Sequence, residues 1–364
     1  MAAVRVLQVV SELNQGGIEN FLMNIYRNID REKVQFDFIV HHMRRGCFED
    51  EIEKMGGKVY HFSLLDDKNI MKYIKNLKCF FRKHKDYSIL HGHLASIGFL
   101  YLSIAKKEGI KCRIAHSHGT ATPKSIKGRI KSILFKGFKK NANILFACSD
   151  EAGKFLFGDS NYTVVPNAID FNRFSYDEKK RLTIRKQNNI KNEMVVGHVG
   201  RFTIEKNHEF IIEILKNMSN KEPNIKFLLI GDGSQKKRIM QKALEEGVDD
   251  KIIFAGNRLN VEDYYSAMDI FILPSLFEGF PVACVEAQAN GLKSFFSSNI
   301  SKEVKITNLA SFIDGFDAEI WSKKILSIDR NYDRKRGSIN KKYDICELAK
   351  NMEEYYIRND KGRL

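Results

Sequence analysis

Two carboxylates, Glu278 and Glu286, stand eight residues apart in the segment PSLFEGFPVACVEAQANG (274–291). The apolar run before them (270–273) predicts a buried strand, and residues 282–290 predict a helix that a glycine ends. Glu278 is therefore expected in a loop at the carboxyl end of a strand, and Glu286 on the helix that follows. In open parallel sheets ligands bind at that edge, although a surface loop and an amphipathic helix would give the same pattern without a ligand.

Two cations belong to a second loop, GRFTIEK (200–206). Arg201 follows a predicted strand, and Lys206 is expected at the start of the next helix. Two fixed cations one loop apart can clamp a diphosphate and neutralise it as it leaves, although two exposed surface charges would look the same. The chain has no strand-end Asp-x-Asp to hold a divalent cation, so we expect Arg201 and Lys206 to replace a metal ion on any bound nucleotide diphosphate.

Glycines occupy two further strand-end turns. Gly16 and Gly17 follow the first predicted strand and open a helix, whose backbone N–H groups could approach an anion. Gly-Gly is also typical of an ordinary tight turn. Gly231 and Gly233 end a later strand and leave room for a flat ligand or a phosphate.

Two His-x-His pairs lie in predicted strands, at 91–93 and 116–118. Alternate residues of a strand share a face, so each pair could ligate zinc, but no carboxylate or cysteine cluster completes a site and no metal is predicted. We expect His118, which precedes a glycine, to reach a substrate hydroxyl or phosphate. His91 and His116 are expected to be core histidines.

Strand and helix patterns alternate along the chain, and the alternation starts again near residue 193. Strict alternation predicts parallel sheets with helices on both faces. Two such sets predict two doubly wound domains, with a junction near 166–180. We assign 1–168 to the first domain, 169–342 to the second, and 343–364 to a terminal helix that packs back toward the first.

The composition supports this division. The chain has 364 residues, of which 43% are hydrophobic, enough for two cores. No run approaches the ~18 apolar residues that span a bilayer, and the N-terminus lacks the apolar core of a signal peptide. The cysteines are scattered without a C-x-x-C pair, so we expect reduced, buried thiols in a cytoplasmic protein.

Basic charge is concentrated in the first half of the chain. Residues 1–165 carry 27 Lys and Arg against 16 Asp and Glu, whereas the remainder carries 33 against 29. The segment 123–142 combines apolar residues at helical spacing with seven basic and no acidic residues, which favours a helix lying on an anionic membrane. A helix that packs its apolar side on the protein core and exposes its basic side to solvent would have the same sequence pattern. A second basic patch lies at 72–85. The basic residues of the segment are Lys124, Lys127, Arg129, Lys131, Lys136, Lys139 and Lys140.

These segments together resemble the family 4 glycosyltransferases, retaining enzymes of the GT-B fold, over nearly the whole chain. The resemblance implies two doubly wound, Rossmann-like α/β domains that face a central cleft. The strongest part is Glu278-Gly-Phe-Pro-x4-Glu286 after DIFILPS, which matches the family's Glu-x7-Glu signature. GRF…EK resembles the family's diphosphate-binding segment, and SHGT its histidine loop. VPNAIDFNRF resembles its domain junction, and GGIE its N-terminal glycine loop.

The resemblance implies a role for each matching residue. Glu286 would bind the ribose hydroxyls of a nucleotide, and Glu278 the hydroxyls of the donor sugar. Arg201 and Lys206 would bind the diphosphate, and His118 would sit near the reacting sugar. Glu278, His118, Arg201 and Lys206 would thus be the catalytic residues. The remaining donor-binding residues would be Gly16, Gly17, Gly231, Gly233, Gly279, Phe280, Pro281 and Val282.

The implied reaction moves a sugar from a nucleotide-sugar, UDP-linked, to a lipid-linked saccharide with retention of configuration. The cations and helix N-termini would stabilise the departing diphosphate, without a metal or another cofactor. The first domain would bind the acceptor and the second the nucleotide-sugar. Pro281 and Lys293 depart from the family pattern and bear on which sugar is used, and 297–313 resembles the subset that builds capsular or exopolysaccharides. We therefore expect a hexosyltransferase of bacterial surface polysaccharide synthesis, peripheral on the inner face of the plasma membrane.

Two other classes remain open. A UDP-sugar 2-epimerase shares the architecture but would need an acid/base set for the sugar C2, and the Glu-x7-Glu segment argues against it. A basic nucleic-acid-binding protein would show basic strips interleaved with exposed aromatic residues, and we expect no nucleic-acid partner.

Overall fold

The computed structural model describes residues 3–360 apart from 15, 65–68, 120–134, 136, 330–331 and 335–339. Contacts divide the chain into two α/β units. Unit 1 comprises Met1–Ala168 and Lys342–Leu364, and unit 2 comprises Ile169–Lys341. No helix in the described part of the chain is long and apolar enough to cross a membrane.

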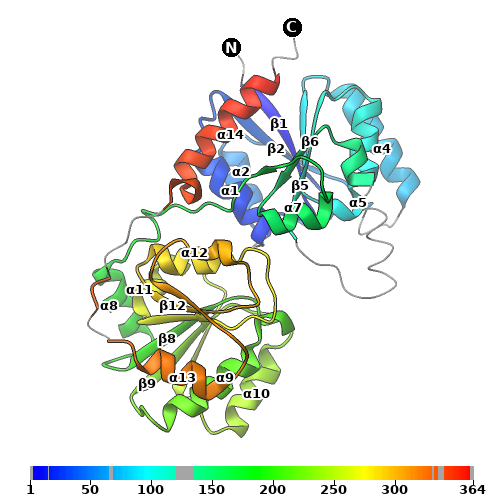
Figure 1. The fold of residues 1–364 in the computed structure, drawn as a ribbon. Helices are drawn as coiled ribbons and strands as arrows, with labels where there is room; N and C mark the ends of the chain where they lie inside the picture. The colour runs from blue at the N-terminus through cyan, green and yellow to red at the C-terminus, as the bar shows by residue number, and fades with distance from the viewer. Residues whose placement is uncertain are drawn as a thin grey trace. The chain divides into compact units, whose positions relative to one another are not determined.

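Unit 1 is built on a parallel sheet in the order β3-β2-β1-β4-β5-β6-β7 (Figure 1). Its strands are β1 (Val4–Val9), β2 (Val34–Val40), β3 (Val59–His61), β4 (Ile89–Gly92), β5 (Cys112–Ser117), β6 (Ile144–Ala147) and β7 (Thr163–Val164). Its helices are α1 (Gly17–Asn28), α2 (Glu49–Lys54), α4 (Ile70–Lys83), α5 (Ala95–Lys107), α7 (Asp150–Phe157) and the C-terminal α14 (Ile345–Asp360).

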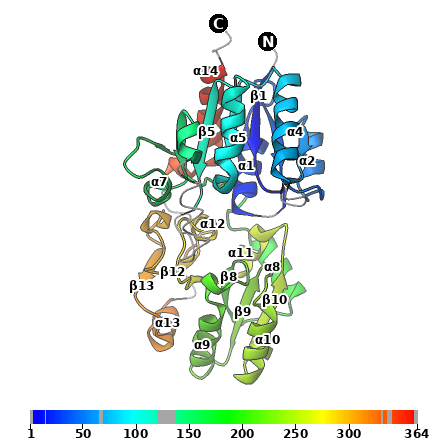
Figure 2. The same cartoon turned by 90° about the vertical axis from the view of Figure 1, so that its right-hand side faces the viewer.

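Helices cover both faces of this sheet because its strands are apolar on both sides. In β1, Val6 joins the core beneath α1 and α14, whereas Leu7 joins the core beneath α4 and α5. Figure 1 shows α14 beside α1, and Figure 2 shows α4 and α5 on the opposite face. The C-terminal helix thus completes the core of the first unit.

Unit 2 is built on a second parallel sheet, in the order β10-β9-β8-β11-β12-β13. Its strands are β8 (Met194–Val199), β9 (Ile225–Ile230), β10 (Ile252–Gly256), β11 (Ile270–Leu273), β12 (Lys293–Ser297) and β13 (Ala310–Ile313). Its helices are α8 (Glu178–Gln187), α9 (His208–Ser219), α10 (Lys236–Glu245), α11 (Val261–Ala267), α12 (Val282–Ala289) and α13 (Ala318–Leu326). Short 3₁₀ turns occur at η1 (Ile204–Lys206), η2 (Asp249–Lys251), η3 (Lys302–Val304) and η4 (Lys341–Tyr343), the last of which spans the boundary between the units.

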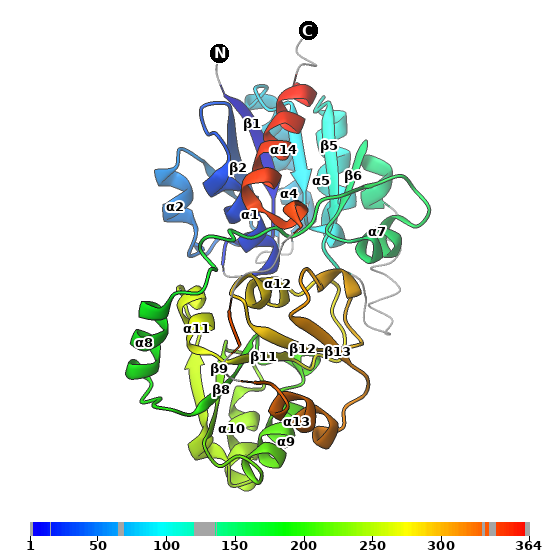
Figure 3. The same cartoon turned by 60° about the vertical axis from the view of Figure 1, so that its left-hand side comes forward.

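A continuous apolar core packs α9, α10 and α13 against one face of this sheet, with Trp321 of α13 fully buried. Figure 3 shows α11 and α12 on the other face. Two doubly wound parallel α/β domains are therefore present, as the alternating sequence pattern predicted.

Each sheet has one point where the strand order reverses: between β1 and β4 in unit 1, and between β8 and β11 in unit 2. The connections from the two central strands run in opposite directions there. In open α/β sheets, ligands bind beside the carboxyl-end loops at such a point. The sequence-predicted site residues of both units lie mainly on these loops.

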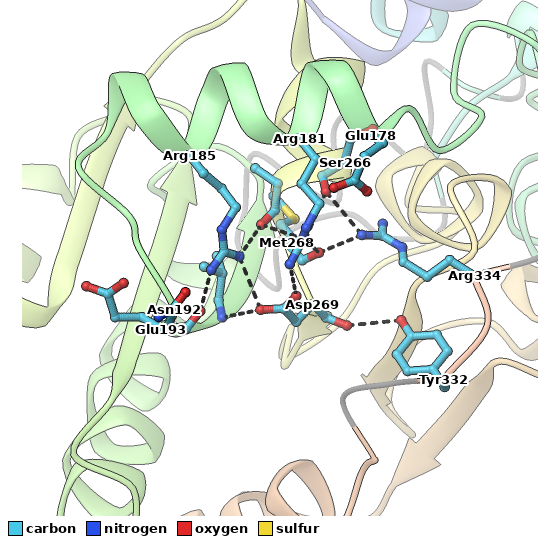
Figure 4. A network of polar contacts seen from close by, with 12 residues as sticks. Glu178, Arg181, Arg185, Asn192, Glu193, Ser266, Met268, Asp269, Tyr332 and Arg334 are labelled. Atoms are coloured by element: carbon cyan, nitrogen blue, oxygen red, sulfur yellow. Dashed lines mark hydrogen bonds and ion pairs between the residues drawn. The ribbon is translucent and has the colours of Figure 1, made fainter.

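The amino end of β11 is held by a polar network (Figure 4). Asp269 accepts from Arg181 at 2.6 Å and from the backbone N–H of Val195 at 2.7 Å. Arg334, from the segment after α13, donates to the Met268 carbonyl at 2.7 Å, and burial lowers the pKa of Arg334 to about 10. This network ties α8 and the segment after α13 to the sheet at the end of β11 opposite to the predicted site.

Two sequence-based expectations need comment. The cysteines are not all buried: Cys112, Cys148 and Cys284 are, whereas Cys47, Cys79 and Cys346 are exposed because they lie in loops or on helix faces that the apolar pattern does not bury. Most of the predicted basic helix, including Lys124, Lys127, Arg129, Lys131 and Lys136, lies outside the described residues.

The end of that basic segment is helical in the structure. Phe138 is fully buried in the core of unit 1, so the apolar stripe faces the core at this position. Lys139 donates to the Phe157 carbonyl at 2.7 Å, and Lys140 is exposed.

Candidate active site

The loops after β8 and β11 touch each other at the switch point of unit 2. The backbone N–H of Leu276 donates to the Glu205 carbonyl at 2.8 Å, and the Asn207 amide donates to the Pro274 carbonyl at 3.2 Å. The sequence pattern predicted Lys206 at the start of the next helix. In the structure Lys206 instead ends the turn η1, because Asn207 adopts a left-handed conformation (φ 55°) before α9. That break lets the lysine side chain reach the neighbouring loop.

Lys206 and Glu278 form an ion pair, with 2.6 Å between Nζ and Oε2. Their side chains are only 15% and 16% exposed. The other carboxylate oxygen of Glu278 accepts from the hydroxyl of the buried Ser275. Both groups are thus oriented before any ligand arrives, which lowers the cost of arranging them around a reacting sugar and diphosphate.

Arg201 lies in the same loop as Lys206, and its side chain is exposed. Within the described residues it makes no ion pair, so its charge is available to an anion. The structure therefore places one uncompensated and one compensated cation on the loop after β8, next to the Glu278 carboxylate.

Glu286 lies on α12, the helix that begins at Val282, just after the Glu278 loop. It accepts a hydrogen bond from the Tyr265 hydroxyl at 2.8 Å. Desolvation raises the pKa of Glu286 to about 7, against the opposing effects of the Tyr265 hydrogen bond and the charge of Arg173. Arg173 itself is held by Glu262, at 3.0 Å. The site therefore contains a carboxyl group that changes charge near neutral pH.

The backbone between the two glutamates completes the loop. Phe280 is buried, and Pro281 caps α12 with no side-chain hydrogen bond to its first turn. Val282 begins the helix. Gly279 precedes this segment, so the first amides of α12 lie close in sequence to Glu278.

The glycines of the next loop have a structural task. Gly231 (φ +136°) and Gly233 (φ +158°) lie where a side chain would meet the carbonyl oxygens of Gly200 and Phe202, at 2.1 and 2.6 Å. They allow the loop after β9 to pack against the loop that carries Arg201. Contact with a nucleotide stays a prediction for both.

In unit 1, Gly16 is the N-cap of α1 and Gly17 is its first residue. Gly16 itself has no side chain to cap the first turn of this helix. A side chain at Gly17 would meet no atom within 4 Å, so the fold of the protein does not itself require glycine there. Approach of a ligand to this turn, at the switch point of unit 1, stays a prediction.

The two His-x-His pairs lie side by side because β4 and β5 are neighbours. His91 and His116 are fully buried, as expected, and the Nε2 of His91 lies 3.1 Å from the Nδ1 of His116. His93 bonds His118 at 2.8 Å. Ring nitrogens of His91, His93 and His116 lie within 4.8 Å of one another. The sequence pattern predicted that the two histidines of each pair share a face, but not that the two pairs lie next to each other.

Several residues of these sites were missed from the sequence. Tyr265 lies in a helix that reads as plain core packing, and Arg173 lies in the junction segment that was used only as a family marker. Ser275 lies just after a strand, and Gln8 lies within the apolar run that forms β1. A buried polar residue inside an apolar run was the one signal that could have pointed to Gln8.

Comparison with known proteins places the chain in a family. Residues 15–173 match the family described as Glycosyltransferase Family 4, and residues 180–343 match that described as Glycosyl transferases group 1. The Bacillus subtilis (strain 168) protein EpsF, which is named as a glycosyltransferase, is 32% identical over 82% of this chain and 80% of its own length. The chain therefore belongs to the family 4 type of glycosyltransferases.

Two further proteins are similar over most of the chain. An Escherichia coli UDP-Gal:alpha-D-GlcNAc-diphosphoundecaprenol alpha-1,3-galactosyltransferase is 24% identical over 89% of both chains. The Anabaena protein HepE, solved in complex with UDP and glucose, has a TM-score of 0.81 at 16% identity and covers 96% of this chain and 98% of its own. This likeness shows that the fold is that of GT-B glycosyltransferases.

Proposed function

We propose that this protein is a retaining hexosyltransferase that moves a sugar from a UDP-sugar to a lipid-linked saccharide in bacterial surface polysaccharide synthesis. The observation that carries the proposal is the Lys206–Glu278 pair at the switch point of unit 2. A lysine and a carboxylate in contact suit a ligand that has an anion beside sugar hydroxyls. A nucleotide-sugar has that arrangement at its reacting bond.

The other residues of the site extend this assignment. Arg201 would join Lys206 on the diphosphate and stabilise it as it leaves. Glu286 would accept hydroxyls of the ribose, and Tyr265 would orient its carboxylate. With two cations on the diphosphate, we propose that no divalent metal is needed. UDP release should then be unchanged by EDTA.

The acceptor is inferred from the E. coli relative, whose name gives a diphosphoundecaprenol-linked sugar as its acceptor. The exposed basic face of α4, beside Ile70 and Met71, which are 55% and 75% exposed, would suit an anionic membrane that holds such a lipid. We therefore propose a peripheral association with the inner face of the plasma membrane.

The experiment measures UDP release from a panel of UDP-sugars, with and without a polyprenyl-diphosphate-linked saccharide in detergent. Release that depends on the acceptor, with a glycosylated lipid as product, is the expected result. Interconversion of the UDP-sugar without acceptor would indicate the epimerase instead. Neither activity, together with salt-sensitive nucleic-acid binding, would indicate the third class and refute the transferase.

A further inference from the structure

Six polar side chains of unit 1 form one continuous hydrogen-bonded chain. Three strands and the C-terminal helix contribute to it: β1, the β4 and β5 ends, and α14. From its half-buried end inward, the chain runs through His118, His93, Gln8, Tyr356, His91 and His116, with separations of 2.8, 2.9, 3.5, 2.8 and 3.1 Å.

The surroundings of this chain are apolar. Phe21 of α1 packs edge-on against the rings of His116 and His118, at 5.4 and 5.5 Å between centroids. Val6 and Phe146 belong to the same core. Burial lowers the pKa of all four histidines, that of His118 to about 3, so each ring is neutral near pH 7. A neutral imidazole has one N–H and one lone pair, and its partners decide which nitrogen carries the proton.

The outer half of the chain therefore has a direction. The Gln8 side-chain oxygen faces His93 Nε2, and an oxygen can only accept, so His93 Nε2 carries the proton. His93 Nδ1 is then the acceptor, and His118 Nε2 must donate to it. The remaining nitrogen of His118, Nδ1, is left with a lone pair. Among the described residues nothing occupies that nitrogen.

We propose that Gln8 and His93 are positioning residues that fix His118 as the Nε2–H tautomer, so that Nδ1 accepts a hydrogen bond from a substrate hydroxyl. The assignment of the ligand group as a substrate hydroxyl rests on the proposed transferase function. The donor-to-acceptor direction of the hydrogen-bonded chain does not. A lone pair repels a phosphate oxygen and attracts an O–H group. Of the two ligand groups that the sequence allowed for His118, the structure thus selects the hydroxyl.

The opposite donor-to-acceptor direction would require the Gln8 side-chain amide to be rotated. Turning the Gln8 amide by 180° would place its NH₂ group on His93 and its oxygen on Tyr356. Every tautomer along the chain would then reverse, and His118 Nδ1 would carry a proton. The two directions therefore differ at one observable atom. Neither leaves His93 a nitrogen free for a metal ion, since both of its ring nitrogens are engaged within the chain.

The first test is spectroscopic and needs no substrate. Long-range ¹H–¹⁵N spectra of the histidine-labelled protein, with His118 assigned through His118→Asn, distinguish a protonated ring nitrogen from one with a lone pair. We expect Nε2 of His118 to be protonated and Nδ1 to carry the lone pair. The reverse assignment in the wild-type protein would overturn the inference.

The second test uses matched variants of Gln8. Gln8→Met removes the acceptor at nearly constant volume. We expect mixed tautomers at His118 and a kcat reduced at least ~10-fold, because a wrong tautomer offers no acceptor at the reacting geometry. Gln8→Glu keeps an oxygen toward His93 and should retain the wild-type tautomer and most of kcat.

The control is Gln35→Met. Gln35 lies on the adjacent strand β2, outside the hydrogen-bonded chain, and its side-chain oxygen accepts from the hydroxyl of Tyr26 on α1. This variant should leave the His118 spectrum and kcat unchanged. A Gln8→Met protein with the wild-type spectrum and kcat would refute the positioning role. If the spectra are as expected but no nucleotide-sugar is turned over, the proposed function fails and the direction of the chain stands.

Discussion

The loops at the carboxyl ends of the two parallel sheets differ in charge. In unit 2, the loops after β8 and β11 bring together Lys206 and Glu278, with Arg201 beside them. In unit 1, the ends of β4 and β5 bring together histidines that are neutral. One parallel-sheet architecture thus presents a charged edge in one unit and an uncharged, hydrogen-bonding edge in the other.

The difference follows from what each edge would bind under the proposed function. A diphosphate gains charge as the bond to the sugar breaks, so fixed cations lower its free energy most where they are already oriented. Sugar hydroxyls carry no charge and need donors and acceptors of fixed direction. The chain from Gln8 to His118 supplies direction without charge. Substitutions that change one edge at a time test whether the two edges have these separate roles.

The largest effect is expected at the charged edge. Glu278→Gln keeps the shape of the side chain but removes the charge that holds Lys206 and that, under the proposed function, would attract sugar hydroxyls. We expect kcat/KM for acceptor-dependent UDP release to fall by ~100-fold or more, as for loss of a preorganised electrostatic group. Thermal unfolding should change little, because the glutamine side-chain oxygen can still accept from Lys206 and so does not leave this largely buried lysine without a partner.

The matched control is Glu246→Gln. Glu246 also pairs with a lysine, Lys216 of α9, but it lies at the far end of α10, away from the β8 and β11 loops. This variant should retain wild-type activity. Equal losses in both variants would mean that any ion pair of unit 2 matters, and the special role of Glu278 would be wrong.

The sequence predicted the fold and several single residues better than it predicted their contacts. Alternating strands and helices set the two parallel sheets, and the strand-turn-helix pattern placed Glu278 and Glu286 correctly. The Lys206–Glu278 contact depends on β8 and β11 being neighbours, and 72 residues separate the two side chains. Periodicity reports which face is buried, but not which strand lies alongside.

The same limit explains the histidine chain. Each His-x-His pair was visible as a pattern of period two, but the strand order β1-β4-β5 is what places Gln8 beside them. Tyr356 reaches the chain only because the C-terminal helix returns to unit 1, 265 residues after His91. Hydrogen-bond partners that are far apart in the sequence, such as Tyr356 and His91, become apparent only once the fold is known.

A smaller effect is expected from Glu286. Its folded pKa of about 7 is raised above the ordinary value, so its contribution to stability is complete below about pH 4.5 and is lost as the pH rises through 7. Under the proposed function, the ribose hydroxyls of the nucleotide would donate to the ionised form of Glu286. Affinity for UDP-glucose should therefore rise about 10-fold between pH 6 and pH 8, as calorimetry can measure.

The groups facing Glu286 are Tyr265, Arg173, Glu262 and Lys206. The Glu286→Gln variant cannot ionise and should bind UDP-glucose weakly with a flat pH profile. A wild-type profile that is already flat, or a variant that keeps the slope, would remove Glu286 from the nucleotide site.

The smallest effect concerns the membrane. Lys140 is exposed at the end of the basic segment, next to Phe138, which is buried in the core. Lys140→Gln should weaken flotation with anionic vesicles about 5-fold, since one lysine near such a surface contributes ~1 kcal/mol. Lys350→Gln, at an exposed lysine of α14 in the same unit, should leave flotation unchanged if the basic segment makes the contact. Equal weakening by both variants would indicate attraction by the overall charge of unit 1, and no change in either would remove this segment from the membrane surface.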